Sequence, residues 1–226
     1  MSNHLKAYAA PKSWHVRRKV NKWIVRPQAG KHPMKRAMPI GLLVRLLGLA
    51  KTAREAKQIV NAGHVFVDGK RASDVHTAVG FMDVVKVGSE ALVRVLIDKK
   101  GRLVFLPAEK GEDQKKVCRV VRKQSVPGGR VQLTLSDGRN LLKEKSEEAV
   151  GDSLVLELPS QKVLERVALE KGAVAMLMGG RHIGNVGTIE RVDGNKITCK
   201  GENGSFETLR QFAFVIGKGK PAVKVQ

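Results

Sequence analysis

The stretch "TAREAKQIVNAGHVFVDGK", residues 52–70, carries the strongest local fold signals in the chain. Thr52 is followed three residues later by Glu55, which is the pattern of a capping box at the start of a helix. Gly63 stands where a glycine ends a helix, and Asp68-Gly69 is a strong signal for a tight hairpin turn. The stretch therefore predicts a short helix, then a strand and a turn.

The residues on either side extend this unit. Leucines at helical spacing predict a preceding helix, and a second apolar stripe marks the inner side of the helix after Thr52. A run rich in valine downstream offers a partner for the predicted strand. These three sets are Leu42, Leu43, Leu46, Leu47 and Leu49; Ala53, Ala56, Ile59 and Val60; and Val84, Val85 and Val87.

Polar and basic residues of the same unit fall away from its apolar stripe. They are Lys51, Arg54, Lys57 and Gln58 on the second helix and Lys70 and Arg71 after the turn. An ordinary solvated helix face is one interpretation of this set. A nucleic-acid face is the better one, because a basic segment without acids lies directly upstream.

The positive charge is concentrated at the N-terminus. The chain of 226 residues has a formal net charge of +21 and a pI near 10.3. Residues 1–54 contain 13 Lys and Arg, whereas the first acid is Glu55. Such a charge favours polyanions, because each phosphate contact releases condensed counterions. An anionic membrane surface and an acidic protein are the competing partners.

Residues 1–38 are predicted to form an extended basic arm, since Pro11, Pro27 and Pro33 exclude a long helix. The arm carries Tyr8, Trp14 and Trp23, which either stack on unpaired bases or anchor the arm to its own domain. A disordered, solvated tail is the alternative. The candidate RNA-binding residues here are Lys6, Lys12, Trp14, Arg17, Arg18, Lys19, Lys22, Arg26, Lys31, Lys35 and Arg36.

From about residue 91 the pattern changes to short strands. "ALVRVLID" and "LVFLP" predict one hairpin through residues 99–102, and "KVCRVVRKQSV" and "RVQLTLSDGRN" predict another through residues 127–129. "DSLVLELP" adds a further strand, and Cys118 is expected to be a small core residue. Residues 91–172 are therefore expected to form a mostly-β domain.

The stretch "GGRHIGNVG", residues 179–187, allows two interpretations. A loop that cradles a nucleotide phosphate must open a helix, but here a strand, an Asp-Gly turn and another strand follow. Gly184 and Gly187 are thus expected to permit a sharp bend and close packing at the corner of a small β-barrel. Arg181 and His182 become candidate contacts to an RNA backbone.

Signals of catalysis, export and membrane insertion are missing from the sequence. There is no P-loop, no H-E-x-x-H pair and no G-x-S-x-G elbow, and the six histidines are dispersed. We therefore expect no enzyme, metal or cofactor. Cys118 and Cys199 are far apart, so a reducing cytoplasm fits better than a disulfide framework. No apolar run is long enough for a membrane span or a signal peptide.

The stretch at residues 52–70 resembles the small RNA-binding domain shared by ribosomal protein S-four, some pseudouridine synthases and tyrosyl-tRNA synthetases. This resemblance implies that Thr52, Arg54, Lys57 and Gln58 face RNA. The segments "HLKAYAAPKSW", "MPIGLLVRLLGLAKTAREA", "VGFMDVV", "LSDGRN" and "GGRHIGNVGTI" occur in the order typical of the archaeal and eukaryotic small-subunit ribosomal family four-e. The last segment resembles the KOW motif, with Gly187 at its glycine.

The arm departs from the four-e pattern at one place. Where the family often has glycine-proline before a basic stretch, this chain has Gly30-Lys31-His32-Pro33. The departure leaves the local path of the arm open. The lack of a catalytic domain argues against the RNA-modifying enzymes that share the module.

Together these observations predict an α+β multidomain chain. Its parts would be a basic N-terminal extension (1–38), a small α/β S-four-like RNA-binding module (39–90), a mostly-β central domain (91–172) and a C-terminal SH3-like (KOW) β-barrel with a basic tail (173–226). The expected function is that of a structural constituent of the 30S subunit, cytoplasmic, bound to 16S rRNA and neighbouring ribosomal proteins, without membrane or homo-oligomer. A free-standing RNA-binding regulator or RNA chaperone is the alternative.

Overall fold

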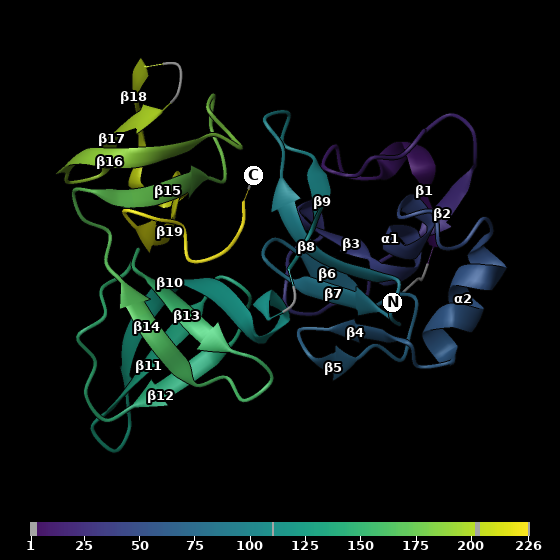
Figure 1. The fold of residues 1–226 in the computed structure, drawn as a ribbon, viewed down its shortest axis with the longest axis horizontal. Coiled ribbons are helices and arrows are strands. Elements are labelled where there is room, and N and C mark those ends of the chain that lie inside the picture. The colour runs from purple at the N-terminus through teal and green to yellow at the C-terminus, as the bar shows by residue number, and fades with distance from the viewer. Residues whose placement is uncertain (1–3, 110, 202–203, 226) are drawn as a thin grey trace. The chain divides into compact units, whose positions relative to one another are not determined.

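The computed structural model describes residues 4–109, 111–201 and 204–225. The chain divides into two units (Figure 1). The first unit contains the chain up to Leu96 together with Arg102–Gln114, and the second contains Ile97–Gly101 with the chain from Lys115 onward.

In the part of the chain that the structure describes, the first unit combines two short α-helices with three small sheets. One sheet has five strands in the order β5-β4-β7-β8-β9, and the other two are the pairs β1-β2 and β3-β6. The elements are β1 (His4–Lys6), η1 (Ala7–Ala9), β2 (Trp23–Val25), η2 (Met34–Arg36), β3 (Ala37–Pro39), α1 (Ile40–Leu46), α2 (Ala53–Asn61), β4 (Val65–Val67), β5 (Lys70–Arg71), β6 (Ala78–Gly80), β7 (Val84–Val87), β8 (Ala91–Ile97), β9 (Leu103–Pro107) and η3 (Glu112–Gln114).

The predicted start and end of α2 are confirmed. The Thr52 hydroxyl accepts a hydrogen bond from the Glu55 amide at 3.2 Å, and the Glu55 carboxylate accepts one from the Thr52 amide at 3.4 Å. Gly63 follows the helix with a φ of +83°, a conformation that glycine adopts without strain. The predicted inner stripe is confirmed at Ala56 and Val60, whereas Ala53 is exposed because it lies in the first turn, outside the packed face.

The hairpin after α2 is also confirmed. Asp68 and Gly69 both have positive φ, at 52° and 75°, which is the backbone of a type I′ turn. β4 pairs with β5 on one side and with β7 on the other, through Val65↔Val87 and Val67↔Val85. The buried Asp68 carboxylate accepts a hydrogen bond from the Val84 amide at 3.1 Å, so the turn is fastened to β7.

The strands expected to open the central domain belong to this first sheet instead. β8 pairs with β7 through Val85↔Val93, and β9 lies beside β8 as the predicted hairpin partner (Figure 1). The hairpin itself was correctly predicted, but the expected boundary at residue 90 separates strands that pair. The reason is that β7 has a second edge whose backbone groups need a partner.

The arm has regular structure where an extended path was expected. β1 and β2 pair antiparallel through His4↔Val25 and Lys6↔Trp23. β3, at the end of the arm, pairs with β6 through Met38↔Val79. The arm is therefore part of the first unit's fold, which sequence periodicity did not reveal because each strand has only three residues.

The second unit contains two five-stranded antiparallel sheets, in the orders β12-β11-β10-β13-β14 and β18-β17-β16-β15-β19. Its elements are β10 (Lys115–Val126), β11 (Arg130–Leu135), β12 (Asn140–Lys143), β13 (Ser153–Glu157), β14 (Val163–Val167), β15 (Ala173–Leu177), β16 (Val186–Asp193), β17 (Lys196–Gly201), β18 (Gly204–Leu209), η4 (Arg210–Phe212) and β19 (Ala213–Lys218).

Both sheets of the second unit contain the predicted hairpins. β10 turns into β11 through residues 127–129, and Cys118 is fully buried in the core of this sheet, as expected. In the other sheet β16 turns into β17 with Asp193 opposite Lys196. The last two strands do not form a pair of their own, because β18 adds to β17 and β19 returns to β15.

Candidate nucleic-acid interface

Trp14 holds the middle of the arm inside the first unit. Its side chain is only 3% exposed, and its indole Nε1 donates a hydrogen bond to the Ala37 carbonyl at 2.6 Å. Next to it, the Leu103 amide donates to the Ser13 carbonyl at 2.8 Å. A ring buried in this way cannot stack on a base. Trp14 is therefore removed from the candidate RNA-binding residues and assigned to anchoring, the other role expected for the arm's aromatic residues.

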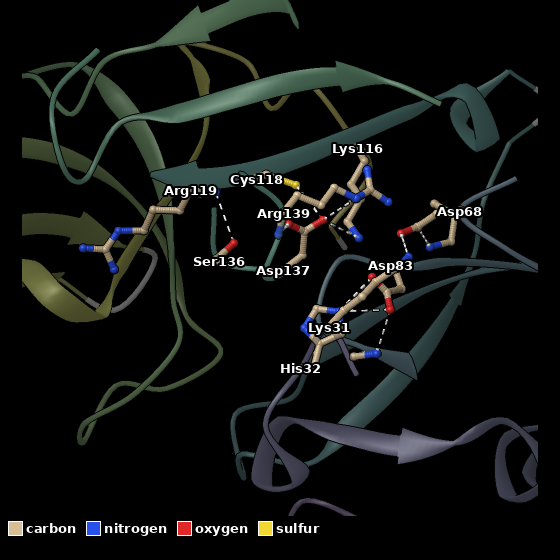
Figure 2. Close-up of polar contacts among 12 residues, drawn as sticks. Lys31, His32, Asp68, Asp83, Lys116, Cys118, Arg119, Ser136, Asp137 and Arg139 are labelled. Atoms are coloured by element: carbon tan, nitrogen blue, oxygen red, sulfur yellow. Dashed lines mark hydrogen bonds and ion pairs between the residues drawn. The ribbon is translucent and has the colours of Figure 1, made fainter. Parts of the chain in front are cut away.

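His32 fastens the end of the arm (Figure 2). Its Nε2 lies 3.0 Å from each carboxylate oxygen of Asp83, and both residues are buried. The Gly80 amide donates to the same carboxylate at 2.9 Å. A Cβ on Gly80 would lie 2.4 Å from the His32 ring, so the absence of a side chain there makes room for the imidazole.

Lys31 lies beside His32 and forms an ion pair with Asp68 at 3.0 Å (Figure 2). The Asp68 side chain is fully buried, whereas that of Lys31 is about one-third exposed. Because the carboxylate offsets much of its charge, Lys31 is a weaker candidate for a phosphate contact than the other cations of the arm. It connects the arm to the hairpin turn.

The other candidate cations of the arm lie at the surface. Arg18 and Arg26 are half-buried, and the rest are exposed. Residues 1–54 of the sequence contain no acidic residue. The exposed ones are Lys6, Lys12, Arg17, Lys19, Lys22, Lys35 and Arg36.

The basic face of α2 is exposed as predicted. Lys51, Arg54, Lys57 and Gln58 are all exposed, as is Thr52 at the N-cap. Glu55 is the acid of this helix. The hydrogen bond from the Lys51 amide, and then that from Thr52, lower the pKa of its carboxyl. The negative charge of Glu55 is thus directed at the helix start.

Arg71 has a local role at the other end of α2. Its guanidinium donates a hydrogen bond to the Asn61 carbonyl at 3.2 Å and covers Gly63, where a Cβ would lie 2.3 Å from the guanidinium. A basic side chain that binds the last carbonyls of a helix stabilises that helix end. Lys70, its neighbour, is exposed.

The glycine-rich loop of the second unit presents Arg181 and His182. Arg181 is exposed, and the half-buried His182 ring stacks on Phe206 with centroids 4.6 Å apart and an interplanar angle of 19°. A Cβ on Gly184 would lie 2.5 Å from the backbone of Asp98, and one on Gly187 would lie 2.9 Å from the Lys200 carbonyl oxygen. Close packing is thus confirmed as the reason for these glycines.

Sequence reasoning missed one pair of exposed basic residues. Lys99 and Lys100 follow Asp98, whose backbone contacts Gly184, so these lysines lie near the Arg181 loop. Their position in a lysine-rich turn was visible, but the contact between distant loops was not. Stacking and anchoring were both expected roles for the arm's aromatic rings, and Tyr8 and Trp23 are exposed, with exposed fractions of 68% and 51%.

Some basic residues of the second unit are turned inward and are excluded as phosphate contacts. Lys116 and Arg139 both pair with the buried Asp137, at 3.3 and 3.1 Å (Figure 2). Burial opposes ionisation of Asp137, but these two cations outweigh it and lower the pKa of the carboxyl. Burial also raises the pKa of the Cys118 thiol, which donates to Asp137 at 3.4 Å. The cluster is structural.

Among the residues that the structure describes, no group of three or more His, Cys, Asp and Glu side chains could hold a metal ion. Within the same residues, no helix is long and apolar enough to cross a membrane.

Three family models match consecutive parts of the chain. Residues 1–35 match the RS4NT domain, residues 42–85 the S4 domain and residues 89–163 the ribosomal family S4e. The small ribosomal subunit protein eS4 of Methanothermobacter thermautotrophicus is 38% identical, over 98% of this chain and 95% of that protein. The chain belongs to the ribosomal S4e family.

Two further S4e proteins are similar to this chain over most of their length. The eS4 protein of Archaeoglobus fulgidus is 38% identical over 95% of this chain and 93% of its own length. The crystal structure of the 30S ribosomal protein S4e from Thermoplasma acidophilum matches with a TM-score of 0.72 and 31% identity, covering 81% of this chain and 96% of that one. The S4 domain match covers most of α1, all of α2 and the hairpin at Asp68, where the basic face lies.

Proposed function

We propose that this chain is a structural, non-catalytic constituent of the small ribosomal subunit that binds 16S rRNA and stabilises its fold. Membership of the S4e family supports the ribosomal role. The observation that carries the mode of binding is the set of exposed cations on the arm and on α2, in a part of the sequence that contains no acid before Glu55. These cations would neutralise phosphates where RNA strands converge.

The proposed RNA contacts are the exposed and half-buried candidates, without Trp14. Arg181 and His182, with Lys99 and Lys100 added, would provide a second attachment on the other unit. Two attachments in one chain raise the effective concentration of the second without any new contact. The C-terminal five-stranded sheet would then act as a KOW-type, SH3-like barrel whose glycine-rich loop meets RNA.

In this role the chain lies in the cytoplasm, within the ribosome and beside other small-subunit proteins. Its two cysteines are free and buried, which suits a reducing compartment. A free-standing RNA-binding regulator would share the same basic surfaces. Fractionation separates the two roles: a ribosomal constituent follows the small subunit through a high-salt gradient at near-stoichiometric amount, and a regulator is released from it.

The electrostatic mode is tested with the double variant Arg54→Ala/Lys57→Ala. Binding of small-subunit rRNA is measured across a salt series, and each lost phosphate contact should reduce the slope of log K against log salt by roughly 0.7 to 0.9. The matched control is Lys145→Ala, because Lys145 is also exposed but lies between Glu144 and Glu147. An unchanged slope in the double variant, with helicity retained, contradicts the proposed role of this face.

A further inference from the structure

The β1–β2 ribbon of the arm exposes two aromatic rings. Trp23 in β2 is 51% exposed and Tyr8, two residues after β1, is 68% exposed, whereas Trp14 is 3% exposed. Large aromatic rings usually provide buried area in a protein of this size. Two exposed rings so close in the fold need an explanation other than packing within this chain.

The rings and three polar residues are brought together by the strand register. Lys6 lies directly opposite Trp23, and His4, two residues earlier on the same side of β1, contacts the Trp23 ring edge-on with centroids 5.5 Å apart. The Lys6 ammonium is 5.7 Å from the centre of the Tyr8 ring, and the Lys22 ammonium is 5.6 Å from the centre of the Trp23 ring. We call His4, Lys6, Tyr8, Lys22 and Trp23 the ribbon cluster.

The ribbon cluster is held by a fixed backbone. The Ala7 amide donates to the Lys22 carbonyl at 3.0 Å, which continues the pairing of β1 and β2 next to both rings. Ala7 and Ala10 are buried on either side of Tyr8, and Trp14 secures the chain that follows. The arm is therefore already ordered in the folded protein. A ligand that binds the cluster would not have to supply the free energy of ordering it.

The chemistry of the cluster fits single-stranded RNA. Exposed aromatic rings stack on bases, and each stacked base is worth about 1–3 kcal/mol, while lysines beside them neutralise the phosphates that flank the bases. Only unpaired nucleotides fit, because bases within an A-form helix have both faces covered. An acidic protein is a poorer partner, since it would satisfy the lysines and leave both rings uncovered.

Resting on the proposed function, we propose that the ribbon cluster is a stacking site for unpaired nucleotides of RNA. Trp23 and Tyr8 each take the face of one base, and Lys6 and Lys22 hold the adjoining phosphates. His4 supports the Trp23 ring from its edge. This part of the arm thus selects loops, bulges or ends over regular duplex.

The test uses the full chain and two probes of equal charge: an oligouridine about 12 nucleotides long and an abasic ribose-phosphate strand of the same length. Trp23→Ala should weaken oligouridine binding about 5- to 160-fold and leave abasic binding within about twofold. Wild-type tryptophan emission should change on oligouridine binding, and Trp23→Phe should abolish that change. Leu142→Ala, at an exposed apolar residue of the second unit, is the control and should change neither affinity.

Equal affinity of the wild-type protein for the two probes overturns the stacking site, as does an equal loss for both probes in Trp23→Ala. Both results leave the electrostatic mode intact if rRNA still binds with a steep salt dependence. Failure of the wild-type protein to bind rRNA at all counts against the proposed function and the stacking site together. Far-UV circular dichroism of Trp23→Ala, and its remaining Trp14 emission, verify that the variant is folded.

Discussion

Replacement of Trp14 by phenylalanine should destabilise the first unit and leave the RNA-facing side chains in place. The substitution removes the indole donor that binds the Ala37 carbonyl at 2.6 Å. Ala37 is fully buried, so the loss of this partner costs about 1–3 kcal/mol. The smaller ring adds about 1–2 kcal/mol for lost apolar burial. The expected loss in free energy of unfolding is about 2–5 kcal/mol.

Urea unfolding followed at 222 nm measures this loss. Both α-helices of the described residues lie in the first unit, so the helical signal reports on that unit. Trp23→Phe is the matched control, because Trp23 is half-exposed and its replacement should change the unfolding free energy by less than about 0.5 kcal/mol.

Limited proteolysis adds a local measurement, since release of the arm should speed cleavage at Arg17 and Lys19. If Trp14→Phe unfolds at the same urea concentration as the wild-type protein and is cleaved no faster, the anchoring role derived from the burial of Trp14 is wrong. Deletion of the arm is a less specific perturbation, because it removes Trp14 and the partner of the buried Asp83 along with the surface cations.

Three further predictions concern stability. Thr52→Ala should lower the free energy of unfolding by about 1 kcal/mol through loss of the helix cap, whereas Thr52→Ser should lower it little. Urea unfolding followed at 222 nm compares the two variants, and equal losses would contradict a capping role for Thr52. Gly184→Ala should lower stability by about 2–5 kcal/mol, because a Cβ meets the Asp98 backbone at a positive φ. Gly194→Ala, with positive φ but open space, should cost only about 1–2 kcal/mol; calorimetry resolves the difference, and similar melting temperatures would refute the packing argument. Burial disfavours the Glu148 carboxylate, but hydrogen bonds from Lys143 and Ser146 outweigh it and lower its pKa to about 2. The ionised Glu148 carboxylate therefore stabilises the fold fully above pH 4.5, and this stabilisation is lost as the pH falls towards 2. The difference in unfolding free energy between wild type and Glu148→Gln should shrink over that range. A difference that stays constant with pH would contradict the lowered pKa of Glu148.

Features set by a few consecutive residues were predictable from the sequence. The cap at Thr52 and Glu55, the turn at Asp68-Gly69 and the bend at Gly184, where φ is +78°, all follow from local backbone chemistry. Each depends on residues that can form only a few low-energy conformations. The sequence also separated the exposed side of α2 from its buried side, because a helix repeats its faces at a fixed spacing.

Features set by contacts between distant segments were not predictable. Trp14 and Trp23 occur in similar basic surroundings, and only the Ala37 carbonyl and the β1–β2 register decide which ring is buried. The placement of β8 depended in the same way on the unpaired edge of β7. Lys99 and Lys100 could be added to the proposed RNA contacts only because the structure shows that Asp98 packs on Gly184. A single sequence contains no direct signal for such pairings.

The fastening of the arm has a consequence for the order of events during synthesis. The arm is synthesised before its attachment points at Gly80, Asp83 and Leu103, which lie much later in the chain. Until then its cations are held on an unstructured chain that attracts any nearby RNA. We therefore expect the nascent arm to be a target for acidic chaperones, whose protection is no longer needed once β9 has been added to the sheet.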